Sequence, residues 1–189
     1  LSGKTIWQAS IARTANTQDL QVADLKMAVE LRQSDLSTVT NNTGGTPPGF
    51  SFLSAVNSAG SFVTDITGAP HWQKYVLYCI PAGTTQLMRQ EIPLASLFPL
   101  GIPSPIPLLS SAQVASSCNG SGAMISSAVT SLSIQPDYNT FLSLNVSSGL
   151  GVGAGVTVGA SNQAVNLALT LQRKNVQGKL DQQSRSTTI

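Results

Sequence analysis

Residues 19–39 decide the fold, and their sequence is DLQVADLKMAVELRQSDLSTV. Apolar side chains recur at helical spacing along this stretch, which predicts an amphipathic α-helix. The face that we expect to pack on the rest of the protein consists of Val22, Leu25, Val29, Leu36 and Val39. No proline interrupts residues 1–46, whereas the Asn-, Gly- and Pro-rich residues 41–49 cannot continue a helix. The sequence therefore predicts one N-terminal helix over residues 1–40.

Beyond the helix, the sequence changes to short alternating segments separated by Gly-, Pro- and Ser-rich turns. The clearest hairpin pairs residues 74–80 with residues 86–92, and the clearest single strand covers residues 163–173. Further short strands are expected at residues 50–56, 61–66, 126–135 and 139–146. We therefore predict a β-rich region over residues 50–175, followed by a polar, mobile tail over residues 176–189.

These elements predict one domain over residues 1–189, of the α+β class, with the N-terminal amphipathic helix packed on antiparallel β-sheet. Charged residues make up only 10% of the chain, and the formal net charge is +2. This charge builds no field that would attract nucleic acid or a membrane surface. The composition thus argues against a nucleic-acid-binding protein.

Cys79 and Cys118 are the two cysteines of the chain. An even pair in a chain that is rich in Ser and Thr is compatible with one disulfide in an oxidising compartment. The alternative is two buried thiols in separate strands, and the sequence leaves both alternatives open.

Residues 93–111 contain five prolines among leucines and isoleucines. This density of proline forbids a central strand or a helix. We expect an apolar loop laid over the core, and if exposed, the same loop is an apolar contact patch.

The chain offers few residues for catalysis or metal binding. His71 is its only histidine, and a general base needs a nucleophile and an orienting acid nearby. One histidine and two cysteines do not make a four-ligand zinc site, although a calcium site built from Asp and backbone carbonyls stays open. The Gly-rich run 147–161 matches the dinucleotide fingerprint only formally, because a strand is expected after it. We therefore expect a non-enzyme with no catalytic residue, no metal, no cofactor and no small-molecule substrate.

Three parts of the chain carry a resemblance to a known family. These are residues 20–36, the pair of segments 72–78 and 87–91, and residues 171–175. They resemble the end of the helix, the hairpin with a tyrosine-containing strand and a Leu-x-Arg return, and the last strand of type IV pilin-like subunits. The most similar group is the minor pseudopilin J and minor pilin W subunits of type II secretion systems and type IV pili.

The resemblance implies a structural subunit that assembles into, or primes, a filament with other pilin or pseudopilin subunits. It implies a location in the periplasm or at the cell surface, with an anchor in the inner membrane before assembly. The family's cleaved leader and the apolar, transmembrane half of its helix have no counterpart here, so we expect a chain truncated before that half. The loops 43–49, 93–111 and 149–161 would be its variable contact surfaces.

Two other classes remain as alternatives to the filament subunit. One is a secreted, β-rich adhesin or carbohydrate-binding module with a helical stalk. The other is a hydrolase that uses His71, for which the chain offers few partner residues.

Overall fold

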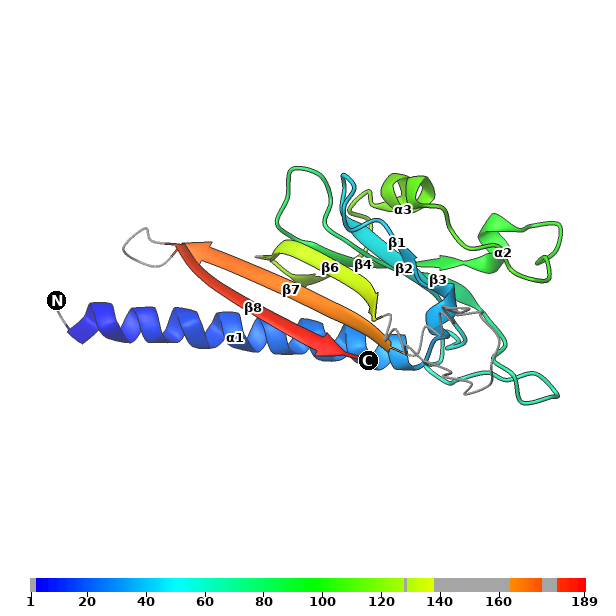
Figure 1. Ribbon diagram of the computed structural model, residues 1–189, viewed down its shortest axis with the longest axis horizontal. Helices are drawn as coiled ribbons and strands as arrows, with labels where there is room; N and C mark the ends of the chain where they lie inside the picture. The colour runs from blue at the N-terminus through cyan, green and yellow to red at the C-terminus, as the bar shows by residue number, and fades with distance from the viewer. Residues whose placement is uncertain (1–2, 128, 138–163, 175–179) are drawn as a thin grey trace, which may run out of the picture.

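The computed structural model describes residues 3–127, 129–137, 164–174 and 180–189 (Figure 1). Its helices are α1 (Gly3–Arg32), the 3-10 turn η1 (Leu36–Thr38), α2 (Leu94–Leu97) and α3 (Ser111–Ser117). Its strands are β1 (Thr40–Asn41), β2 (Gly49–Ser54), β3 (Lys74–Cys79), β4 (Leu87–Pro93), β5 (Ala123–Ser126), β6 (Val129–Asp137), β7 (Ala164–Lys174) and β8 (Leu180–Thr188). The α+β class with an N-terminal helix and antiparallel sheets is thus confirmed.

The first sheet has five antiparallel strands in the order β1-β2-β3-β4-β5. Its central strand β3 is buried on both faces, and successive side chains serve two different hydrophobic cores. Val76, Tyr78 and the following Ile80 join the core beneath α1, while Tyr75, Leu77 and Cys79 join the core beneath α2 and α3. The sheet therefore separates a helix layer on one face from a loop layer on the other.

The second sheet has three antiparallel strands in the order β6-β7-β8 and contributes to the same core as α1. Strand β7 occupies the segment where the clearest strand was predicted. The predicted strand at 139–146 and the Gly-rich run 147–161 lie outside the described residues. In Figure 1, the β7–β8 hairpin runs along α1, and the N-terminal end of α1 reaches beyond all the strands.

The prediction of a mobile tail over residues 176–189 was wrong for its larger part. Strand β8 pairs with β7 from Lys174↔Leu180 to Asn166↔Thr188. This strand lacks the apolar alternation that marks a half-buried strand, since its residues are mostly polar and Ser184, Arg185 and Ser186 are exposed. Backbone pairing with a strongly apolar neighbour forms it instead.

The prediction for the packing face of α1 was also wrong. Three of its five residues, Val22, Leu25 and Val29, point to solvent, with 61%, 65% and 43% of their surface exposed. Leu36 and Val39 do pack against the core, but they lie beyond the end of α1. The buried face consists of Leu20, Ala23, Asp24, Met27, Ala28 and Leu31. The two alanines are small enough for the helix to approach the sheet, and the longer side chains fill the space above the stacked rings of Phe50, Phe52 and Tyr78.

Helix α1 ends at Arg32, earlier than the predicted residue 40. The Ser34 hydroxyl donates to the Leu31 carbonyl, and the Asp35 side chain accepts the Ser37 amide to start η1. Strand β1 then begins at Thr40, which turns the chain back along the sheet. Residues 61–66, predicted as a strand, form only isolated bridges.

The proline-containing segment covers the face of the sheet opposite α1. Leu94 and Leu109 are buried there, whereas Leu97, Leu100, Ile102 and Leu108 are exposed, so the loop is both a cover and an apolar surface. The short helix α2 was not expected, and it fits because no proline lies between Pro93 and Pro99. Cys79 and Cys118 form a disulfide that joins β3 to the end of α3.

Candidate functional site

The outer face of α1 is the candidate functional site. Val22, Leu25 and Val29 lie at i, i+3 and i+7, which places them in one stripe on the helix surface. A helix advances by about 100° per residue, so this stripe lies roughly opposite the buried face that contains Met27. We call these three residues the outer stripe. Helix α1 therefore has two apolar faces, and its own domain covers only one of them.

The second apolar face is unusual for a helix that packs on a single domain. Such a helix normally carries charged or polar residues on its solvent side. Burial of one exposed Val or Leu side chain contributes about 1.5–3 kcal/mol. The outer stripe can therefore stabilise contact with another apolar helix or sheet.

A network of ionic groups fixes the position of the outer stripe relative to the sheet. The Arg89 guanidinium donates from Nε to the Glu30 carboxylate of α1 at 2.9 Å, and the Tyr78 hydroxyl donates to the same carboxylate at 2.8 Å. Arg89 also donates to Glu91 at 2.7 Å, and Lys74 pairs with Glu91 at 2.8 Å. The network connects the last turns of α1 to β3 and β4, so α1 cannot rotate its outer stripe inward without breaking it.

The environment of this network shifts the pKa values of Tyr78, Arg89 and Glu91. Burial raises the pKa of the Tyr78 hydroxyl, and the neighbouring Glu30 carboxylate adds to the effect. Partial burial acts to raise the pKa of Glu91, but hydrogen bonds from Lys74 and Arg89 outweigh it and hold that pKa below its ordinary value. Glu91 is therefore a carboxylate at neutral pH, and Tyr78 is a neutral hydrogen-bond donor.

A second polar contact holds β8 against α1. Asp24 lies on the buried face of α1 with only 2% of its surface exposed. Its Oδ2 atom accepts from Arg185 Nε and from the Thr187 hydroxyl, both at 2.7 Å. We call these three residues the β8 clasp. Sequence reasoning missed it, although a carboxylate in the middle of an apolar helix face and an arginine in a polar C-terminal segment were its visible signals.

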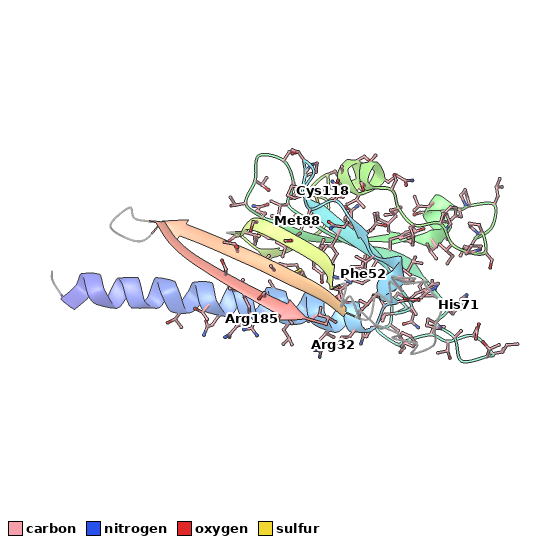
Figure 2. All side chains as sticks on the ribbon, viewed as in Figure 1. Arg32, Phe52, His71, Met88, Cys118 and Arg185 are labelled. Atoms are coloured by element: carbon pink, nitrogen blue, oxygen red, sulfur yellow. A yellow bond between two sulfur atoms is a disulfide. The ribbon has the colours of Figure 1, made fainter. Side chains whose placement is uncertain are left out.

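The remaining predicted residues are not brought together into a reactive site. His71, labelled in Figure 2, is exposed in the segment before β3, where its backbone N–H donates to the Val63 carbonyl. Within residues 3–127, 129–137, 164–174 and 180–189, no group of three His, Cys, Asp or Glu side chains lies close enough to hold a metal ion. The contact loop predicted at 43–49 joins β1 to β2, and the one predicted at 149–161 lies outside the described residues.

Comparison with known proteins identifies no relative that bears on this arrangement. No protein-family model, curated protein or solved structure matches the chain. In the part of the chain that the structure describes, no helix combines the length and the apolar character that crossing a bilayer requires.

Proposed function

We propose that this protein is a non-catalytic structural subunit of a pilin-like filament, of the minor pilin or pseudopilin kind. The observation that carries the proposal is the outer stripe of α1, an apolar helix face that its own domain leaves uncovered. A subunit of this kind acts through contacts with its neighbours, and two apolar faces on one helix allow it to hold its own domain and a neighbour at once.

The shape of the chain supports the proposal. Helix α1 is 30 residues long and extends past the strands at its N-terminal end, as Figure 1 shows. A helix that projects from a sheet-containing head is a rod that neighbouring subunits can pack against. The spacing i, i+3 and i+7 is that of the seam along which two helices pack in a coiled coil. In the proposed filament, the outer stripe contacts the helix of an adjacent pilin-like subunit.

The disulfide between Cys79 and Cys118 supports the proposed location. Disulfides persist in oxidising compartments such as the periplasm and the cell surface. In the proposed function, the sheets of the subunit lie outside the cytoplasm, and the subunit is anchored in the inner membrane before assembly. The sparse charge of the chain agrees with a surface that contacts other proteins over much of its area.

Site-specific crosslinking in cells that make the protein from its full gene tests the proposal. A photoreactive amino acid at Leu25 should give crosslinked products with other subunits in the filament or secretion fraction. The same amino acid at Ile66 is the matched control, because Ile66 is fully exposed on the loop between β2 and β3. Equal crosslinking at both positions, or none at Leu25, would contradict the proposal.

The alternative of a carbohydrate-binding module has less support. A groove lies beside the apolar loop, and residues of the loop line it in part. Its lining consists of aliphatic side chains, prolines, Trp72, His71 and three hydroxyl-bearing residues. Carboxylate and amide side chains are absent from this lining, so only the hydroxyl groups, His71 and Trp72 could fix the orientation of a sugar.

A further inference from the structure

A cavity lies between the C-terminal turns of α1, strands β3 and β4, and the loop that joins β2 to β3 (Figure 1). Its volume is about 420 Å³, which is within the range of sites that hold small molecules. The basic side chains in its lining are Lys26 from α1, Lys74 from β3 and Arg89 from β4, and the acidic ones are Glu30 and Glu91. The lining therefore carries one more positive than negative charge.

The two carboxylates of the cavity have no oxygen without a partner. Both oxygens of Glu30 accept from Arg89 Nε, and Oε2 also accepts from the Tyr78 hydroxyl. Glu91 Oε1 accepts from Arg89 Nη2 at 2.7 Å, and its Oε2 lies 2.8 Å from Lys74 Nζ. The acidic side chains are thus occupied by protein donors and offer little to a second cation.

The loop wall of the cavity is arranged in the same way. The Asn57 Oδ1 atom accepts from the backbone N–H groups of Ala59 at 2.9 Å and Ser61 at 3.0 Å, which leaves the Nδ2 group to donate. The Ser54 hydroxyl oxygen accepts from the Val56 N–H at 3.2 Å, so its own O–H remains as a donor. Hydrogen-bond donors therefore exceed free acceptors on this wall as well.

The basic side chains hold the largest share of unused donors. In the part of the chain that the structure describes, Arg89 Nη1, the Lys26 ammonium and the remaining protons of Lys74 have no protein acceptor. Only 16% of the Arg89 side chain and 11% of the Lys74 side chain are exposed. Burial acts to lower the pKa of Arg89, but hydrogen bonds to Glu30 and Glu91 outweigh it and raise that pKa, so the guanidinium keeps its charge.

The balance of donors and charge determines what the cavity can hold. An occupant that meets free N–H groups and an excess of positive charge must accept hydrogen bonds and carry negative charge. Carboxylate and phosphate groups do both, and Arg and Lys are their usual partners in proteins. We propose that the cavity binds a small-molecule oxyanion, a carboxylate or phosphate compound, through Lys26, Lys74 and Arg89. This site goes beyond the proposed filament contact, because it needs no residue of the outer stripe.

An NMR titration of the purified chain with sodium acetate and with inorganic phosphate, at constant ionic strength, tests the site. We expect the backbone amide signals of Ser58 and Gly60, which line the cavity, to shift with at least one anion and not with neutral acetamide. The anion that binds more tightly identifies the group that the site prefers. K26Q should weaken binding about tenfold, because it removes one charge-assisted contact. The control R32Q removes the same charge from an exposed residue of α1 outside the lining and should leave the affinity unchanged.

S58D gives a second test without touching the ionic network. Ser58 is exposed on the loop wall, so the variant should fold normally, and its added carboxylate should compete with the titrated anion and abolish the shift at Gly60. No response of the wild-type chain to either anion would overturn the inference. An equal response to acetamide would also overturn it, as would equal weakening by K26Q and R32Q, because net charge alone would then explain binding. None of these results bears on the contact proposed for the outer stripe.

Discussion

The inner and outer faces of α1 are both apolar, but only one is buried. The inner face combines Leu20, Met27 and Leu31 with two alanines, and it packs on both sheets. The outer face carries Val22, Leu25 and Val29 and meets solvent. Apolar character alone therefore does not decide which face of a helix enters the core. Small residues that allow close approach, and polar residues that find partners, decide it as well.

The largest effect is expected from a charge on the inner face. Met27 is completely buried, so M27K places an unpaired ammonium in the core and should cost about 4 kcal/mol or more of the free energy of unfolding. The matched variant L25K, two residues away on the outer face, should change the free energy of unfolding by no more than about 0.5 kcal/mol. Urea denaturation followed by circular dichroism measures both. If the two variants lose similar amounts of stability, Leu25 is not on a solvent-exposed face of α1.

Removal of the disulfide should have the next largest effect, on the other side of the sheet. The cysteines are 39 residues apart, and opening a loop of that length should cost about 3–4 kcal/mol. C79A/C118A should lower the midpoint of thermal unfolding, and the wild-type protein should lose a similar amount of stability in reductant. Mass measurement with and without reductant gives the control, because the oxidised chain is lighter by two hydrogen atoms. An unchanged mass on reduction would contradict the bond.

The β8 clasp is expected to contribute less. In R185A, the buried Asp24 carboxylate keeps only its hydrogen bond from the Thr187 hydroxyl. Because Arg185 is itself half-exposed, we expect the free energy of unfolding to fall by about 2 kcal/mol, which is less than for a fully buried ion pair. Hydrogen exchange should become faster along β8 while β3 keeps its protection. R32A removes an exposed arginine from the end of α1, away from β8, and is the control. Uniform loss of protection in all strands would show that the clasp acts on the whole fold.

The sequence predicts some of these elements and not others. Strands β3, β4 and β7 were predictable because β-branched and aromatic residues or strict alternation identify them without tertiary information. Strand β8 was not, because its polar side chains carry no periodic signal and it forms by pairing with β7. The disulfide could only be left open, since spacing along the chain does not give the distance between two Cα atoms.

The helix face shows a different limit of sequence reasoning. Periodicity identified an apolar stripe at Val22, Leu25 and Val29, and that stripe exists. A second stripe with the same period runs through Leu20, Met27 and Leu31, diluted by Ala23 and Asp24. Hydrophobic periodicity favours the helix face with the most large apolar residues. It therefore missed the inner face, because the alanines and the paired Asp24 make that face less apolar. The candidate site was thus found in the sequence but assigned to the core.

Acidification should weaken the network that orients α1. The folded-state pKa of Glu91 is below its ordinary value of 4.5, so its contribution to stability is complete above that value and is lost as the pH falls through the lower, folded-state pKa. Glu91 is partly exposed, and after solvent screening we expect no more than about 1 kcal/mol. E91Q should remove this part of the pH dependence, whereas Q90E, one position away, should not. A pH profile of E91Q that matches the wild type below pH 4.5 would contradict the assignment.

The smallest effect on stability, and the most informative one, is expected on the outer stripe. V22Q/L25Q keeps good helix formers at both positions and adds no charge, so the free energy of unfolding should change by no more than about 0.5 kcal/mol. If α1 contacts a neighbouring subunit through this stripe, the same variant should be absent from the filament fraction of cells that make it at normal levels. If the variant is stable but is not incorporated into the filament, the outer face of α1 serves assembly, whereas the inner face serves folding. If the variant instead unfolds readily, its own domain covers the stripe, and the reason for expecting a neighbour there disappears.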